Sequence, residues 1–239
     1  MQDNRIHIIM PVKDSIEMAE RSIRTIVQSG HTLCIYDDNS QAANAKHLDA
    51  IAKELNCQII HIADLTNHPS PNYRFVLQHA QQRALAENQH LVIVESDVMV
   101  QADTLNRMLA EVQDEVGMVA AVTTDEEGTY NFPYHYLRNW RYRFMRKKTF
   151  ATKKRLSFCC TLLTNELLQK ADFQHLDPTK NWYDVTISHW SLRLGLHNLL
   201  MLDNNVLHFP HGSRPWKRLK YTHPLRYYWR KLTQQLDKI

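Results

Sequence analysis

The chain has 239 residues, 44% of them hydrophobic and 23% charged, and a formal net charge of +4. These values are typical of a globular protein with a buried core and exclude a largely disordered chain. The N-terminus lacks the pattern of a secretory signal, and no apolar run is long enough to cross a bilayer, so we expect a cytoplasmic protein.

The glycine and cysteine residues argue against several further classes of protein. The five glycines form neither G-x-G-x-x-G nor a Walker A loop, which disfavours a dinucleotide oxidoreductase or a P-loop NTPase. The four cysteines lack zinc-ligand spacing, so we interpret them as buried thiols of a reducing compartment, without disulfides.

The first half of the chain alternates short β-rich runs with helical patterns. Arg5 to Met10 reads as a strand that Pro11 ends, and apolar residues at helical spacing follow until Gly30. Further strands are predicted at 32–36, 57–62, 91–94 and 117–124, with helices at 48–55, 76–85 and 105–112. This alternation predicts a mostly parallel sheet covered on both faces, in which ligands bind at the carboxyl ends of the strands.

The second half is less regular. Residues 125–154 read as a long, basic and aromatic connection. Strands are predicted at 155–163, 198–202 and 206–209, and helices at 165–170, 185–194 and 225–236. Since the sequence contains no repeat and no low-complexity linker, one domain with a C-terminal appendage is the simplest interpretation.

Acidic residues follow two of the predicted strands. In the stretch Asp37-Asp38-Asn39-Ser40, the residue types favour an Asx turn or a helix N-cap, and the alternative is a carboxylate that binds a nucleobase or ribose. Glu95 and Asp97 lie two apart in an extended segment, where both side chains would share a face and bind one hard divalent cation. The alternative for this second site is capping of the next helix by Asp97 or Asp103, since a single E-x-D is a weak signal.

A third acidic residue, Asp184, precedes a predicted helix. It is expected either to cap that helix or, near the carboxyl edge of the sheet, to act as a general base toward an acceptor hydroxyl.

Four motifs, in order, resemble the family 2 nucleotide-sugar glycosyltransferases, which are inverting enzymes with the GT-A fold. The motifs are IIMPVKD, YDDNS, VIVESDVMV and NWYDVTISHWSLRLG, the last followed by VLHFPHGS. The resemblance implies an α/β fold, a Rossmann-like αβα sandwich with a mostly parallel central sheet flanked by helices. It also implies a glycosyltransferase domain over 1–213, with a nucleotide-binding half (1–123) and an acceptor-binding half (124–213), and a basic aromatic tail over 214–239.

The resemblance further implies roles for individual residues. The donor nucleotide would be bound by Pro11, Val12, Asp14, Asp37, Asp38, Arg74, Glu95 and Ser96. A divalent metal, Mn²⁺ or Mg²⁺, on the donor diphosphate would be held by Asp97, by Glu95, and by one of two histidines, His208 or His211. The ion would neutralise charge on the departing diphosphate, and Asp184 would be the catalytic base.

Several positions depart from the family pattern. Glu95 stands where the family usually has Asp, so it is expected to contact either the ion or the ribose and second-shell water. Tyr183 replaces a Glu before the base, and Thr186 replaces an acidic residue after it, which leaves the acceptor pocket undefined. Arg74 has two equal interpretations, a nucleotide contact or a solvated helix arginine.

Two basic, aromatic segments, YHYLRNWRYRFMRKK and KRLKYTHPLRYYWRKL, have three interpretations. They would bind nucleic acid, lie against an anionic membrane surface, or be solvated loops. Because the first segment occupies the place of the family's acceptor-facing loop, acceptor or membrane contact is favoured over nucleic acid.

The predicted function is transfer of a sugar from a nucleotide diphosphate donor to a glycan or lipid-linked saccharide acceptor, with inversion. We expect a role in cell-surface polysaccharide or lipopolysaccharide synthesis, with peripheral contact to the inner face of the cell membrane. A nucleotidyltransferase of similar architecture and a catalytically inactive glycan-binding relative are the alternatives. The first commonly has a Gly-rich, basic loop after strand one, which PVKDSIEMAE is not. No short motif reports the sugar, the base, the acceptor or the oligomeric state.

Overall fold

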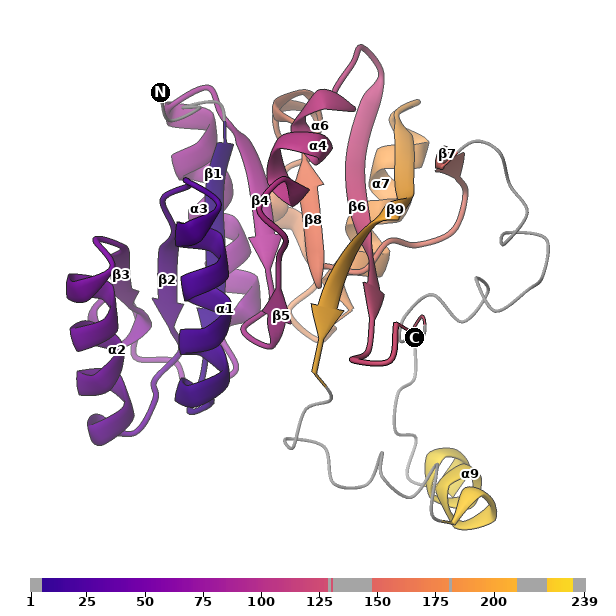
Figure 1. Cartoon of the computed structure of the whole chain (residues 1–239). Helices are drawn as coiled ribbons and strands as arrows, with labels where there is room; N and C mark the ends of the chain where they lie inside the picture. The colour runs from indigo at the N-terminus through magenta and orange to yellow at the C-terminus, as the bar shows by residue number, and fades with distance from the viewer. Residues whose placement is uncertain (1–5, 129, 131–147, 181, 210–222, 234–239) are drawn as a thin grey trace. The chain divides into compact units, whose positions relative to one another are not determined.

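The computed structural model describes residues 6–128, 130, 148–180, 182–209 and 223–233. The chain divides into two compact units, Met1–His208 and Phe209–Ile239. The first unit contains a β-sheet with helices, and the second contains the helix α9 (Pro224–Thr233) (Figure 1). The predicted His211 and most of the segment 134–148 lie outside the described residues.

The sheet of the first unit has the strand order β3-β2-β1-β4-β8-β6-β9-β5, and β7 pairs with β9. The strands that run in one direction are β1 (Ile6–Val12), β2 (Cys34–Asp37), β3 (Gln58–His61), β4 (His90–Val94), β6 (Val116–Thr124) and β9 (His197–His208). Those that run in the opposite direction are β5 (Val98–Met99), β7 (Thr149–Thr152) and β8 (Cys160–Leu163). The predicted mostly parallel sheet is confirmed, with β8 antiparallel between β4 and β6.

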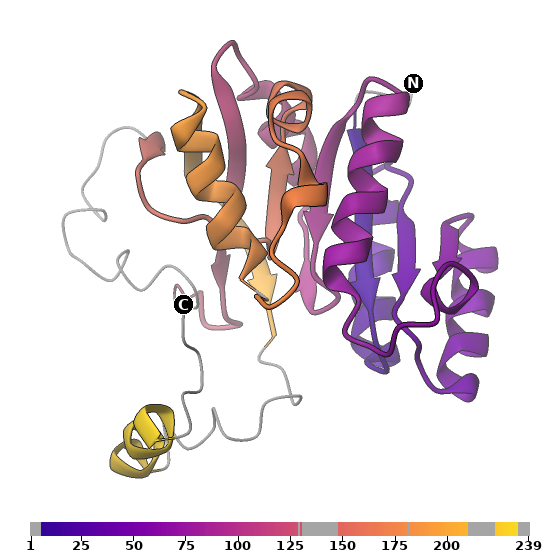
Figure 2. The same ribbon diagram turned by 180° about the vertical axis from the view of Figure 1, so that it is seen from behind.

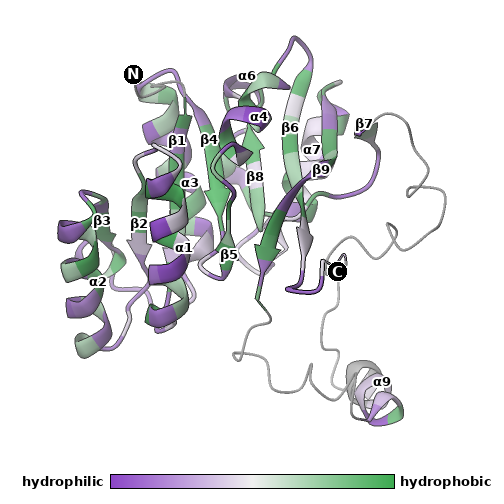
Figure 3. Ribbon diagram, viewed as in Figure 1, coloured by the Kyte–Doolittle hydropathy of each residue, from purple (hydrophilic) through white to green (hydrophobic). Residues whose placement is uncertain are grey.

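Helices cover both faces of this sheet (Figures 1 and 2). One face carries α1 (Ile16–Gln28), α2 (Ala42–Glu54) and α4 (Thr104–Ala110), and the other carries α3 (Tyr73–Ala86), α6 (Asn165–Lys170) and α7 (Tyr183–Arg193). Short 3₁₀ turns lie at η1 (Ile62–Asp64) and η3 (Phe173–His175). Each face has its own hydrophobic core. Ile23 and Leu48 are buried in the core on the side of α1, α2 and α4, and Val76 and Ile187 are buried in the core on the side of α3, α6 and α7. Figure 3 shows the hydrophobic strands between helices whose outer surfaces are hydrophilic, as expected of an αβα sandwich.

The prediction that Pro11 ends the first strand was wrong. Pro11 lies inside β1 and is paired in register with Tyr36 of β2. On the other side of β1, the pairing with β4 ends at Ile9. A proline has no backbone N–H and cannot donate a hydrogen bond to a neighbouring strand. It is tolerated here because β4 does not pair with β1 at this position.

Two further predictions in the second half were wrong. β9 is one continuous strand, not two, and its register against β6 shifts between Met201 and Asn205. The polar residues in this bulge break the hydrophobic pattern without ending the strand, and the Asn204 side chain donates to Thr104 O at 3.1 Å. The strand β7 lies in a stretch that was predicted to be irregular.

Candidate active site

The acidic motif after β4 forms a sharp turn that returns to the sheet as β5. Val98 N donates to Glu95 O at 3.0 Å, and Glu95 N donates to Cys159 O at 2.9 Å. The hydroxyl of Ser22 in α1 donates to Val98 O. Val98 is paired in register with His208 of β9. The apolar residues after the motif therefore hold the end of β9 beside it.

This strand pairing brings His208 to Asp97. Nε2 of His208 lies 3.2 Å from Oδ2 of Asp97, and the two side chains are only 12% and 4% exposed. The N-cap position of α4 is Asp103, whose side chain makes no capping hydrogen bond. The alternative that Asp97 caps this helix is therefore wrong, and its carboxylate belongs to a buried polar cluster.

Glu95 and Cys159 extend this cluster. The Cys159 thiol donates to Oε2 of Glu95 at 3.2 Å. One donor atom from each of Glu95, Cys159 and His208 lies within 4.8 Å of the others. Burial raises the pKa of the Cys159 thiol well above its usual value, and Glu95 adds to the rise. Carboxylate and imidazole donors gathered in this way fit a divalent ion such as Mn²⁺. The prediction that Cys159 is a buried thiol holds, but its place beside the acidic motif was not foreseen.

Asp184 lies in the first turn of α7, next to the same cluster. The N-cap position is Trp182, so the prediction that Asp184 is the N-cap residue was wrong, although its Oδ1 accepts from Val185 N in the first turn at 2.8 Å. The pKa of Asp184 is raised to about 6, chiefly by burial and in smaller part by the Glu95 carboxylate, while the Val185 N–H and Arg155 act in the opposite direction. A carboxylate tuned toward neutral pH is suited to general-base catalysis.

Arg155 is a site residue that no motif indicated. It lies in the connection between β7 and β8, and the neighbouring Leu156 N donates to the Ser188 hydroxyl of α7 at 3.0 Å. This contact holds the segment against the helix that carries Asp184. The guanidinium lowers the pKa of Asp184 and so favours its ionised form.

Tyr73, the first residue of α3, is a second residue that sequence patterns missed. Burial raises the pKa of its hydroxyl well above 10, and Glu95 and Asp184 add to the rise. The hydroxyl oxygen is buried and has no hydrogen-bond partner among the described residues. The ring packs against Tyr183 with centroids 6.2 Å apart. A buried hydroxyl without a partner is costly, and a bound substrate can satisfy it.

The two aspartates at the end of β2, Asp37 and Asp38, are bonded to protein groups. Asp37 Oδ1 accepts from Ser40 N at 3.1 Å, a turn-stabilising bond made three residues on, where an Asx turn makes it two residues on. Its Oδ2 lies 2.9 Å from Nδ1 of His61. The Asp38 carboxylate accepts from Ser70 Oγ at 2.7 Å, and from Asn72 N and Nδ2 at 2.9 and 2.8 Å. Asp38 thus fixes the loop before α3, and a nucleobase contact would add to these bonds.

The other residues predicted to bind nucleotide occupy different surroundings. Asp14 Oδ1 accepts from Gln41 N at 2.7 Å and from Asn44 Nδ2 at 2.9 Å, which stabilises the start of α2. Arg74 Nη1 donates to Leu176 O at 3.4 Å. At the ends of β1 and β4 lie Pro11, Val12 and Ser96. Their nucleotide contacts stay predictions.

Comparison with known proteins identifies the family. Residues 7–170 match the sequence model of "Glycosyl transferase family 2". The chain belongs to glycosyl transferase family 2. No curated protein matches this family 2 chain by sequence.

Solved structures support the same fold. The mannosyltransferase PcManGT from Pyrobaculum calidifontis, in complex with GDP-Man and Mn²⁺, is 17% identical with a TM-score of 0.62, covering 95% of this chain and 64% of that one. TarS 1–349 from S. aureus is 14% identical with a TM-score of 0.64, covering 90% and 62%. GalNAc-T7 with UDP, GalNAc and Mn²⁺ is 12% identical with a TM-score of 0.63, covering 87% and 44%. The family 2 chain therefore has the GT-A fold and spans less than two thirds of the length of each of these structures.

A pocket of about 510 Å³ lies between the segment around the start of α3 and the loop before α7 of the family 2 chain. Its lining includes Asn72 before α3, Tyr73 and Arg74 in the first turn of α3, Lys180 before α7, and Tyr183 at the start of α7. Tyr73 belongs both to this lining and to the surroundings of Glu95 and Asp184. The pocket is therefore a candidate for substrate binding.

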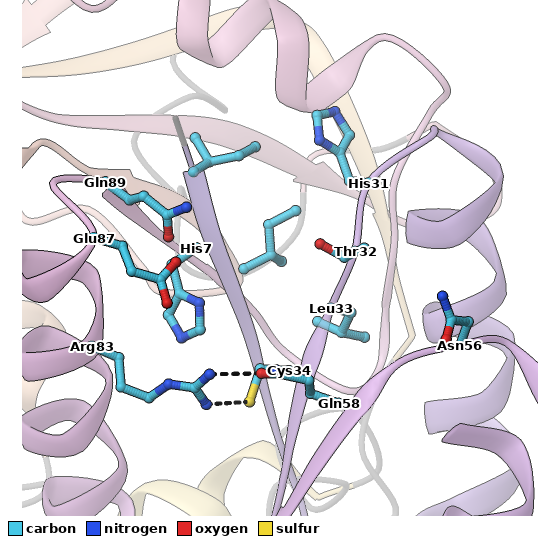
Figure 4. A pocket seen from close by; sticks show the side chains of 12 residues that line it. His7, His31, Thr32, Leu33, Cys34, Asn56, Gln58, Arg83, Glu87 and Gln89 are labelled. Atoms are coloured by element: carbon cyan, nitrogen blue, oxygen red, sulfur yellow. Dashed lines mark hydrogen bonds between the residues drawn. The ribbon is translucent and has the colours of Figure 1, made fainter. Parts of the chain in front are cut away.

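A second, polar pocket of about 240 Å³ lies at the amino ends of β1 and β2 (Figure 4). Arg83 donates to Gln58 Oε1 at 2.7 Å and to Cys34 Sγ at 3.3 Å. Burial lowers the pKa of His7 to about 4, so this imidazole is neutral at pH 7. Because the pocket is at the edge where the parallel strands begin, it is separate from the acidic site of the family 2 chain.

Among the described residues, no helix is long and apolar enough to cross a membrane.

Proposed function

We propose that this family 2 chain transfers a sugar from a nucleotide diphosphate donor to a glycan or lipid-linked saccharide, with inversion, in polysaccharide or lipopolysaccharide synthesis. The observation that carries the proposal is the convergence of Asp97 and His208, 3.2 Å apart, with Glu95 and the base candidate Asp184. A nucleotide-sugar donor and a divalent metal are supported by PcManGT, solved with GDP-Man and Mn²⁺, and by GalNAc-T7, solved with UDP, GalNAc and Mn²⁺.

Asp184 acts as the base in this proposal. Its carboxylate takes the proton of an acceptor hydroxyl, and that oxygen forms a bond to the anomeric carbon of the donor. The bond from the anomeric carbon to the diphosphate breaks, and its electron pair leaves with the diphosphate. Asp97 and His208 would hold a Mn²⁺ ion, which would supply positive charge to the leaving diphosphate. Arg155 favours the ionised form of Asp184, and Tyr73 offers a hydroxyl to a substrate oxygen.

A thermal-shift screen of nucleotide-sugars, with and without Mn²⁺, tests the donor assignment. We expect one donor to raise the melting temperature, and to do so more with Mn²⁺, because a ligand specific to the folded state stabilises it by about 2.7 kcal/mol at a hundredfold excess over its Kd. A nucleotidyltransferase would be stabilised by nucleoside triphosphates instead. A binding-only domain would respond to glycans and to neither nucleotides nor metal. Absence of any shift with nucleotide-sugars contradicts the proposal.

We also propose that α9 docks on an anionic membrane surface, where a lipid-linked acceptor would be reached. Leu225 and Trp229 lie one helical turn apart and are 88% and 69% exposed. The sequence around them is rich in Lys and Arg, which anionic lipid attracts.

Vesicle sedimentation tests this docking. The double substitution Leu225→Ser and Trp229→Ser should weaken binding to anionic vesicles at least roughly tenfold, because two apolar contacts with lipid are lost. Thr233→Ala, on the same helix, should have no effect. Equal binding by the double variant and the wild type, or no binding by the wild type, rules the proposal out.

A further inference from the structure

The cluster beside the acidic motif combines three kinds of donor atom. A carboxylate oxygen of Glu95, the sulfur of Cys159 and a ring nitrogen of His208 lie within 4.8 Å of one another. Oδ2 of Asp97 is 3.2 Å from Nε2 of His208 and supplies a fourth donor. We propose that Cys159 is a metal ligand, and that this site binds Zn²⁺ or Co²⁺ in preference to Mg²⁺ and Mn²⁺. The inference deepens the proposed function by naming the ions that compete for its metal site.

The chemistry of the donors sets this preference. Thiolate sulfur is a soft ligand that selects zinc-like ions, whereas Mg²⁺ and Mn²⁺ favour oxygen ligands. A four-coordinate zinc ion lies about 2.3 Å from sulfur and about 2.0–2.2 Å from nitrogen or oxygen, so small side-chain shifts suffice to bring these donors around one ion. On binding, the S–H bond of Cys159 breaks, the sulfur gives an electron pair to the ion, and the proton passes to water.

The backbone holds the thiol in place before any ion arrives. Cys159 O accepts from Glu95 N at 2.9 Å, which fixes the two residues across from each other. The Ser157 hydroxyl lies 3.0 Å from Cys159 Sγ. The next residue, Cys160, begins β8 and is paired in register with Val94 of β4. A donor fixed in this way loses little conformational entropy when it coordinates an ion.

The alternative role for Cys159 is a hydrogen bond that orients Glu95, without a bond to metal. The two roles differ in what a cobalt spectrum shows, since only a sulfur–cobalt bond produces a thiolate-to-cobalt charge-transfer band in the near ultraviolet. The neighbouring Cys160 provides a matched control, because it is also buried and its sulfur contacts Met108 Sδ at 3.8 Å in the core.

The test is a Co²⁺ titration of the full chain, followed by competition with other ions. The wild type should develop the charge-transfer band, lose it on addition of Zn²⁺, and keep it in excess Mg²⁺. Cys159→Ala and Cys159→Ser should lack the band and bind Zn²⁺ roughly 100-fold more weakly, while Cys160→Ala keeps both properties. A wild type without the band, or a band that survives in both Cys159 variants, overturns the inference. Far-ultraviolet circular dichroism establishes that each variant is folded.

The outcome of the cobalt titration does not depend on whether the chain binds or transfers a nucleotide-sugar. If the band forms and depends on Cys159 but nucleotide-sugars neither bind nor react, the metal inference holds and the proposed function fails. If the wild type transfers sugar with Mn²⁺ but forms no cobalt–thiolate band, the proposed function holds and the inference fails.

Discussion

Replacement of Asp184 by Asn should lower sugar transfer by roughly 10²- to 10⁴-fold, because the variant has no carboxylate to accept the proton of the acceptor hydroxyl. Donor binding should change little, since the substitution keeps the size of the side chain. The measurement is release of nucleoside diphosphate at saturating donor and acceptor, alongside the Kd of the donor. Turnover at the wild-type rate would show that Asp184 is not the base.

Asp184→Asn should also change how the melting temperature of the protein depends on pH. Burial raises the pKa of Asp184 from 3.8 to about 6, so the folded state disfavours the ionised carboxylate. This cost is absent below about pH 4, grows as the pH rises through 4 to 6, and is complete above about 6. Since an amide does not ionise, Asp184→Asn should melt at a higher temperature than the wild type above about pH 7 and show no such gain near pH 4. Asp114→Asn, an exposed control at the amino end of β6, should alter neither stability nor turnover.

The second large effect is expected at Asp97. Asp97→Asn should remove the Mn²⁺ dependence of donor binding and weaken metal affinity by at least roughly 100-fold, because the buried carboxylate 3.2 Å from His208 is replaced by a neutral amide. Calorimetric titration of Mn²⁺ and of the donor measures both quantities. An Asp97→Asn variant with wild-type Mn²⁺ affinity would contradict the metal assignment.

Glu95→Gln provides the comparison within the same turn. Glu95 accepts a hydrogen bond from the Cys159 thiol at 3.2 Å. If Glu95 contacts the ion directly, Glu95→Gln should weaken Mn²⁺ nearly as much as Asp97→Asn does. If it binds ribose or second-shell water, the loss should fall on donor affinity instead. Asp114→Asn again serves as the surface control.

Hydrophobic periodicity was sufficient to predict most of the fold. Apolar residues at helical spacing located α1 and α2, and the prediction of α6 at 165–170 matches the observed Asn165–Lys170. The predicted strand ends were wrong where pairing with neighbouring strands decides whether a strand continues. Pro11 continues a strand because one side of β1 makes no ladder bond there, and β9 remains whole because Asn204 is bonded inside its bulge.

The candidate site was only partly predictable, because contacts between residues far apart in the sequence bring its side chains together. The motifs and their resemblance to family 2 indicated Asp97, His208 and Asp184 as site residues. They did not indicate that Val98 pairs with His208 and so holds the imidazole at the carboxylate. Cys159 belongs to the cluster through a contact across 64 positions, which no local pattern reports. Tyr73 and Arg155 were missed because their roles depend on tertiary packing.

The anomeric configuration of the transferred sugar is the most direct test of the central claim, that Asp184 serves a single displacement at the donor. Once the donor is known, proton NMR of the product formed with Mn²⁺ gives this configuration. We predict that it is inverted relative to the nucleotide-sugar, because the acceptor oxygen attacks the face opposite the diphosphate. A product that retains the configuration of the donor would contradict this account.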